Sequence, residues 1–335
     1  MKISVLGAGT WGTALSILLA NNGHDVVLWS KIKREIESLT ADRSNIPNLP
    51  GAVLPETIKL SYEMSDATAA DPDIIVFAVA SPYTRETAKH LASLVKKGQI
   101  IVNVGKGIEE NTLFTLTDII RDEIPDADVA VLSGPSHAEE VSRLIPTTCV
   151  VGAGSLKTAT LIQDAFMSES FRVYTSPDVI GIELGGSLKN VIALAAGMAD
   201  GLGFGDNTKA ALMTRGIAEI SRLGVKMGGR TETFSGLSGI GDLIVTCSSI
   251  HSRNRNAGYY IGQGMSVNDA MKKVAQVVEG VYSAKAALAL ARKYNVEMPI
   301  VEQVNHILFD NKSVKDAVSD LLLRDKTHES DSFSW

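Results

Sequence analysis

The first dozen residues constrain the fold more than any other part of the chain. A β-branched run at residues 3–6 leads directly into the glycine pattern GAGTWG at residues 7–12, and helical periodicity follows. In such a strand–turn–helix unit the glycines allow a tight turn and a close approach to a pyrophosphate, which the first N–H groups of the helix also bind. A glycine pattern alone is a weak signal, but this context predicts dinucleotide binding rather than a plain turn. The glycines concerned are Gly7, Gly9 and Gly12.

Strand and helix patterns then alternate through the first half of the chain. Four further β-branched runs are expected to form buried parallel strands, at residues 26–29, 74–79, 100–104 and 129–132. Helical periodicity lies between them, at residues 31–39, 82–97 and 113–123. Two more strand patterns, at 147–151 and 171–174, flank a helical run at 156–166 and extend the same sheet. This order predicts a doubly wound α/β Rossmann domain over residues 1–178.

The pattern changes after Pro177, where strand signals stop. The following runs are rich in Ala, Leu and Ile with helical spacing, at residues 179–201, 209–223, 266–277, 282–293 and 301–309. A chain of 335 residues is long enough for two cores at roughly 150 residues per domain. We therefore expect an all-helical second domain over residues 179–325, and a polar tail over residues 326–335 that frays.

Composition excludes several classes of function. The chain has 32 basic and 38 acidic side chains, a net charge of −6, which disfavours a binder of nucleic acids. The longest apolar stretch, residues 191–199, is shorter than the roughly 18–20 residues of a membrane span. Two cysteines without a CxxC pattern predict neither a disulfide framework nor a metal site. The first residues lack the apolar core of a secretory signal, so we expect a cytoplasmic location.

The residues after Trp29 bear on the choice of dinucleotide. An acidic side chain at the end of the second strand would accept bonds from a ribose 2′-OH, whereas cations would bind a 2′-phosphate. Here no acid follows directly, and Lys31, Lys33 and Arg34 do. This predicts that NADP is accepted, with a solvated first helical turn as the alternative, and the cofactor is NADP or NAD.

Two lysines are candidates for binding a ligand or for acid–base catalysis. Lys106 lies between two glycines after the strand at 100–104, at the sheet edge where such folds bind ligands. Lys189 lies within an apolar helical run, and Gly185 and Gly186 are neighbours on its helix face. Burial lowers the pKa of a lysine toward the range that suits general acid–base catalysis at neutral pH. The alternatives are a surface loop lysine for the former and a lysine that extends to solvent for the latter.

Polar side chains in three glycine-rich or basic turns complete the candidates. Asp242 follows a glycine-rich turn at a helix start, where it could also act as an N-cap. The run SRNR at residues 252–255 provides a guanidinium that could bind a phosphate monoester. The alternative is that this run is only a basic turn on the surface. His137, in the turn after the strand at 129–132, is more typical of a packing residue than of a general base.

Seven segments form one set across the chain: GAGTWGTA at 7–14, NLPG at 48–51, NVGKGIE at 103–109, SGPS at 133–136, LKNV at 188–191, GDLIVTC at 241–247 and SRN at 252–254. Together they resemble the bacterial NAD(P)-dependent sn-glycerol-3-phosphate dehydrogenases, over residues 1–325. Where family members commonly carry His-Arg after the second strand, this chain has Lys31-Ile32. The choice between NADP and NAD therefore stays open.

The resemblance implies a role for each matched residue. Lys189 would donate and accept the proton at the substrate C2 oxygen, Lys106 would bridge cofactor and substrate, and Asp242 would join the catalytic polar network. The implied substrate-binding residues are Lys106, Gly134, Ser136, Lys189, Asp242, Ser252, Arg253 and Asn254. The implied cofactor-binding residues are Gly7, Gly9, Thr10, Trp11, Gly12, Lys31, Lys106, Ala138, Arg253, Val277 and Glu279.

The implied activity is the NAD(P)H-dependent interconversion of dihydroxyacetone phosphate and sn-glycerol 3-phosphate, which supplies glycerol phosphate for phospholipid synthesis. The expected partner is a small phosphate substrate, with a homodimer as a candidate assembly. A related dehydrogenase that acts on a hydroxy acid or a sugar acid is one alternative. A nonenzymatic regulator that binds NAD(P)H is another.

Overall fold

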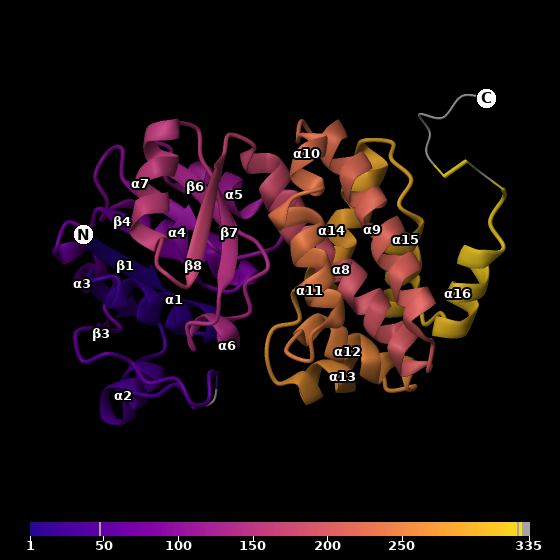
Figure 1. Ribbon diagram of the computed structural model, residues 1–335, viewed down its shortest axis with the longest axis horizontal. Coiled ribbons are helices and arrows are strands. Elements are labelled where there is room, and N and C mark those ends of the chain that lie inside the picture. Colours follow the sequence, from indigo (N-terminus) through magenta and orange to yellow (C-terminus); the bar gives the residue numbers. More distant parts are fainter. Residues whose placement is uncertain (47, 327, 330–335) are drawn as a thin grey trace.

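The structure is a computed structural model that describes residues 1–46, 48–326 and 328–329. A half that contains a sheet and a half made of helices lie side by side along the long axis (Figure 1). Most of the predicted tail at 326–335 lies outside the described residues.

Within the described residues, eight strands form one sheet in the order β3-β2-β1-β4-β5-β6-β7-β8. The strands are β1 (Lys2–Leu6), β2 (Asp25–Trp29), β3 (Lys59–Ser61), β4 (Ile74–Phe77), β5 (Ile100–Asn103), β6 (Asp128–Ser133), β7 (Thr147–Gly152) and β8 (Phe171–Ser176). All neighbours from β3 to β6 are parallel, β7 is antiparallel to β6, and β8 is parallel to β7. The doubly wound α/β fold class is confirmed.

Helices cover both faces of this sheet. They are α1 (Thr10–Asn21), α2 (Lys33–Asp42), α3 (Met64–Ala69), the 3-10 turn η1 (Ser81–Tyr83), α4 (Thr84–Ala92), α5 (Leu116–Glu123), α6 (Ala138–Val141) and α7 (Leu156–Phe166). Because successive strand residues point to opposite faces, Val5 and Leu6 of β1 belong to two different buried clusters. Burial on both faces explains why the central strands are continuous apolar runs.

Some element boundaries differ from the predictions. The edge strand β3 and the short helix α3 were not predicted, because three residues with one lysine carry little periodic signal. The helix expected at residues 113–123 begins at Leu116, where Thr115 and Asp118 form a capping box. The helix expected at 82–97 is split, with η1 first and α4 ending at Ala92.

The second half is helical throughout its described residues. Its elements are α8 (Val179–Gly201), α9 (Asp206–Lys226), α10 (Thr231–Phe234), the distorted π turn η2 (Leu237–Gly241), α11 (Asp242–Ser248), α12 (Arg253–Gly262), α13 (Val267–Val274), α14 (Glu279–Lys293), α15 (Pro299–Phe309) and α16 (Val314–Leu322). The predicted helical runs are present, and α11 begins at Asp242, where a helix start was expected, while α10, α12 and α16 are additional.

Helix α8 is the centre of this half. It is buried on nearly every side, and other helices pack around it. Within the described residues it is the one helix long and apolar enough to span a membrane, with a mean hydropathy of 1.4. Since 83% of that stretch is buried inside the protein, it reads as a core helix.

Candidate active site

Two lysines share one buried carboxylate where the two halves meet. Lys106, in the loop after β5, donates to Oδ2 of Asp242 with an Nζ–O distance of 2.6 Å. Lys189, in the middle of α8, donates to Oδ1 of the same carboxylate and to Oγ1 of Thr246, the latter at 2.6 Å. Asp242 thus joins two candidate residues that the sequence placed far apart.

Burial and neighbouring charge set the ionisation of this cluster. Burial lowers the pKa of Lys189 to about 7; Asp242 opposes the shift and Lys106 adds to it. Burial alone would raise the pKa of Asp242, but the two ammonium groups outweigh it and hold that pKa below its ordinary value. Asp242 therefore stays ionised, while Lys189 is poised to exchange a proton near neutral pH.

The two glycines before Lys189 make room for the cluster. A Cβ at Gly185 would lie 2.6 Å from the carbonyl oxygen of Ser238 in η2. A Cβ at Gly186 would lie 2.9 Å from Oγ of Ser133 and 3.5 Å from Cγ of Lys106. The small neighbours predicted on the helix face of Lys189 are thus what lets Lys106 approach α8.

Helix α8 also holds the loop that carries Lys106. Glu183 accepts a hydrogen bond from Nδ2 of Asn103 at 2.8 Å, and Oδ1 of Asn103 accepts from the backbone N–H of Gly105 at 3.0 Å. One turn further along α8, Ser187 donates to the carbonyl oxygen of Gly107 at 3.1 Å. These contacts were not predicted, although an acid within an apolar helical run was a visible signal for Glu183.

The turn after β6 contributes backbone groups. The carbonyl oxygen of Gly134, which has φ +148°, accepts from Nζ of Lys106 at 3.2 Å and from Oγ of Ser136 at 3.1 Å. Both predicted residues of this turn therefore lie beside Lys106.

His137 lies in the same turn, outside the hydrogen-bond network of the cluster. Its ring packs 6.0 Å from that of His251, centroid to centroid, and makes no hydrogen bond to Lys106, Lys189 or Asp242 in the described structure. Burial lowers the pKa of His137, with Lys189 adding to the shift.

The SRNR segment forms the start of α12. Oγ of Ser252 accepts from the backbone N–H of Arg255 at 3.2 Å, and Oδ1 of Asn254 accepts from that of Gly280 at 2.8 Å. Arg255 binds Asp200 at 2.6 Å, whereas Arg253 is exposed and has no hydrogen bond or ion pair within the described part of the chain. Of the two arginines, Arg253 is thus the one available to a phosphate.

Glycine contacts place this segment against α8. A Cβ at Gly258 of α12 would lie 2.1 Å from the carbonyl oxygen of Leu194, and one at Gly197 of α8 would lie 2.0 Å from that of Arg255. The helix backbones therefore touch, which fixes the start of α12 relative to Lys189.

The predicted glycine turn lies between β1 and α1 and has room for a pyrophosphate. Gly7 has φ +116°, and a Cβ there would lie 2.8 Å from the backbone of Ala78. A Cβ at Gly12 would lie 1.8 Å from the carbonyl oxygen of Gly7. Gly9 is exposed and a Cβ there would meet no described atom within 4 Å. Two glycines serve packing, and the middle one leaves open space beside the N-terminus of α1, so the residues present fit a dinucleotide.

Other predicted cofactor residues surround the ends of the strands. Thr10 and Trp11 open α1, Ala138 opens α6, and Val277 precedes α14. Glu279, the first residue of α14, accepts hydrogen bonds from the backbone N–H of Ser81 at 3.2 Å and from its hydroxyl. Burial raises the pKa of Glu279.

Lys31 is not free in this structure. Its ammonium pairs with Glu86 of α4 at 2.5 Å, a partner that no local pattern predicts because it lies 55 residues away.

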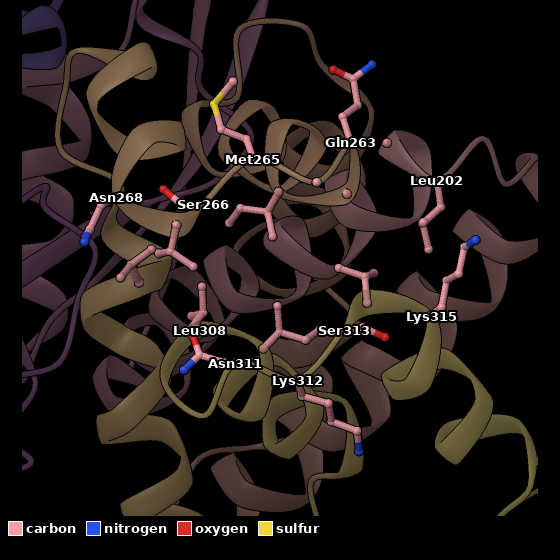
Figure 2. A pocket seen from close by; sticks show the side chains of 18 of the residues that line it. Leu202, Gln263, Met265, Ser266, Asn268, Leu308, Asn311, Lys312, Ser313 and Lys315 are labelled. Carbon is pink, nitrogen blue, oxygen red and sulfur yellow. The ribbon is translucent and has the colours of Figure 1, made fainter.

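A separate hollow of about 1180 Å³ lies among the helix ends of the second half (Figure 2). It is lined by side chains from the loop between α12 and α13, from α13, and from the turn between α15 and α16, including Met265, Asn268 and Lys312. Its described lining includes none of Lys106, Lys189 and Asp242.

Comparisons with known proteins match both parts of the chain to the same family. The model of the N-terminal part of NAD-dependent glycerol-3-phosphate dehydrogenase matches residues 2–159, and that of the C-terminal part matches residues 178–319. The glycerol-3-phosphate dehydrogenase (NAD(P)+) of Agathobacter rectalis is 62% identical over 334 residues, which cover 100% of this chain and 99% of that protein. The protein of the same name from Fusobacterium nucleatum is 58% identical over 335 residues, covering 99% and 100%.

A solved structure is also similar over nearly its whole length. The glycerol-3-phosphate dehydrogenase of Coxiella burnetii is 36% identical, with a TM-score of 0.93, and the match covers 96% of this chain and 99% of that one. The resemblance drawn from the seven sequence segments is confirmed. The chain is an oxidoreductase and belongs to the NAD-dependent glycerol-3-phosphate dehydrogenase family.

Proposed function

We propose that the chain interconverts dihydroxyacetone phosphate and sn-glycerol 3-phosphate, with NAD or NADP as the hydride carrier. The observation that supports this most is the contact of Lys106 and Lys189 with the two oxygens of Asp242. Such a pair of ammonium groups offers a proton donor and a fixed positive charge for one carbonyl oxygen. Arg253 supplies a free guanidinium for the phosphate.

Lys189 acts as the proton donor and acceptor. In the direction of reduction its ammonium gives a proton to the C2 oxygen of the ketone, and in oxidation its neutral amine takes the proton from the alcohol. A pKa of about 7 makes both forms accessible at neutral pH. Asp242 and Thr246 hold the Nζ atom in place through their hydrogen bonds.

Lys106 stabilises the negative charge that develops on the same oxygen. Its side chain is fixed by Asp242 and by the carbonyl oxygen of Gly134, so little reorganisation is needed when the charge appears. The half-buried Lys106 also lies at the edge of the sheet that carries the dinucleotide turn, so it can contact both ligands.

The phosphate of the substrate binds near the start of α12. Arg253 forms a charge-assisted bond to it, and Ser252 and Asn254 flank that arginine. Gly134 and Ser136, in the turn after β6 beside Lys106, contribute the other contacts to the substrate. Binding energy from this remote phosphate holds the reacting carbon beside Lys189.

The glycine turn and the first turn of α1 hold the dinucleotide. Its nicotinamide ring supplies or accepts the hydride at C2 when bound. Gly7, Gly9 and Gly12 shape the turn, Thr10 and Trp11 open the helix, and the remaining contacts come from Lys31, Lys106, Ala138, Arg253, Val277 and Glu279.

The proposal extends to organisation and setting. Residues 1–178 act as the dinucleotide-binding domain and residues 179–325 as the substrate-binding domain. The enzyme acts in the cytoplasm, as a homodimer, and supplies glycerol phosphate for phospholipid synthesis. Sedimentation of the purified chain tests the dimer.

Oxidation of NADH and of NADPH, followed by absorbance with dihydroxyacetone phosphate, tests the activity. Parallel assays with 2-keto acids and with oxidised sugar acids separate it from a related dehydrogenase. Turnover with the triose phosphate alone supports the proposal. Nucleotide binding without turnover of any of these compounds would instead favour a regulator.

A further inference from the structure

An ion pair spans the carboxyl end of β1. Strands β2 and β4 flank β1 in the sheet. Lys31 follows β2, and Glu86 lies in the first turn of α4, which follows β4. The 2.5 Å contact between Nζ of Lys31 and Oε1 of Glu86 therefore passes over the end of β1, where the glycine turn begins. This is the crevice in which open α/β sheets bind dinucleotides.

The structure also places carboxylates beside the cations that follow β2. Glu35 folds back and accepts from Oγ of Ser30 at 2.6 Å, and Glu86 reaches Lys31 from the neighbouring unit. Lys33 lies 3.8 Å from Glu37 and 5.1 Å from the ring centre of Tyr62. Of the three predicted cations, Arg34 alone has no partner among the residues described.

We propose that Glu86 is a specificity-determining residue that disfavours NADPH relative to NADH because it holds Lys31 and adds negative charge to the crevice. The inference rests on the proposed function, since it concerns the dinucleotide of that reaction. A 2′-phosphate carries close to two negative charges, so it must compete with Glu86 for Lys31 and is repelled by that carboxylate. A 2′-hydroxyl is uncharged, so it does not have to displace Glu86 from Lys31 and is not repelled by the carboxylate.

The exposure of the pair makes this competition reversible. The side chains of Lys31 and Glu86 are 59% and 54% exposed, and exposed ion pairs are weak enough for a ligand to displace. The hydrogen bond and charge of Lys31 lower the pKa of Glu86, so the carboxylate is ionised throughout the neutral range. The selectivity is therefore a moderate bias, and NADPH is still accepted.

Direct binding tests the inference without depending on turnover. The fluorescence of NADH and of NADPH is titrated with the full chain at one ionic strength, because exposed charges are screened by salt. Glu86→Gln should lower the Kd for NADPH by about threefold to tenfold and change the Kd for NADH by less than about twofold. Asp126→Asn is the matched control, since it breaks an exposed pair with Lys97 near the amino ends of the strands. It should leave both Kd values unchanged.

A second substitution distinguishes an effect of Glu86 that acts by holding Lys31 from an effect of its negative charge alone. In the Lys31→Gln background, Glu86→Gln should shift the NADPH Kd by less than half as many logarithmic units as in the wild type. Equal shifts in both backgrounds, or an unchanged ratio of the two Kd values in Glu86→Gln alone, would overturn the inference and leave the proposed function intact. A wild-type chain that binds neither nucleotide would overturn both.

Discussion

Asp242 and Lys189 form an ion pair with side chains only 2% and 6% exposed, which ties the start of α11 to the middle of α8. A buried charge pair of this kind is costly to assemble unless further hydrogen bonds satisfy it. Lys106 and Thr246 provide them. This cost is consistent with a pair that holds a proton donor at a fixed point.

Lys189→Met should reduce kcat by about a hundredfold to ten-thousandfold, the range that general acid–base groups contribute. The thioether fills the space of the alkyl stem but carries no proton. The glycine turn is untouched, so the Kd for NADH should stay within about twofold of the wild type. Rapid mixing and fluorescence titration measure the two quantities. Activity within a few-fold of the wild type would remove Lys189 from the mechanism.

The pH dependence should have opposite signs in the two directions. Reduction needs the protonated form of Lys189, so kcat should fall as the pH rises through about 7. Oxidation needs the neutral amine, so kcat should rise over the same interval. Rates of both directions measured between pH 5.5 and 9 in buffers of constant ionic strength check this. Parallel profiles would show that another group controls the rate.

The two arginines at the start of α12 should behave differently. Arg253→Ala removes the free guanidinium, so the KM for dihydroxyacetone phosphate should rise by roughly tenfold to a hundredfold, in line with a lost charge-assisted bond. Arg255→Ala leaves Asp200, 11% exposed, with Lys209 alone, so it should lower the melting temperature instead. Steady-state kinetics and thermal melts of both variants separate the roles. A KM that is unchanged in Arg253→Ala would place the phosphate elsewhere.

The glycine turn offers a contrast between function and stability. Gly9→Ala adds a methyl group to open space, so the protein should melt near the wild-type temperature while the Kd for NADH rises several-fold. Gly12→Ala places a methyl group 1.8 Å from the carbonyl oxygen of Gly7, so it should destabilise the fold. If Gly9→Ala binds NADH like the wild type, the pyrophosphate does not approach that glycine.

The sequence alone predicts those parts of the fold and the site that depend on a local residue pattern. The glycine turn at residues 7–12 has a strand pattern before it and a helix pattern after it, which together predict the unit. The apolar run around Lys189 predicts a buried helix. Contacts between distant segments carried no such signal. From the sequence alone, Asp242 could equally be an N-cap, because nothing near it points to its partner Lys106. In the same way Lys31 is predicted to be a free cation, because nothing near it points to Glu86.

Glu183 is a further group whose surroundings only the structure shows. It is 3% exposed, its Oε2 atom has no partner within the described residues, and burial raises its pKa to about 7, with Asn103 opposing the shift. Below the pKa of the unfolded chain, about 4.3, both states are protonated. Between that value and about 7 the unfolded chain is ionised and the native one is not. Native stability therefore falls as the pH rises through this window, by up to about 4 kcal/mol.

Glu183→Gln should remove this dependence, because an amide does not ionise and its oxygen can still accept from Asn103. The melting temperature of the variant minus that of the wild type should therefore be larger at pH 8 than at pH 5. Any fixed penalty of the unpaired amide group cancels in this comparison. Thermal melts at the two pH values, with a substitution of the exposed Glu232 of α10, Glu232→Gln, as the control, measure it. A difference that does not change with pH would mean that Glu183 is ionised in the folded protein.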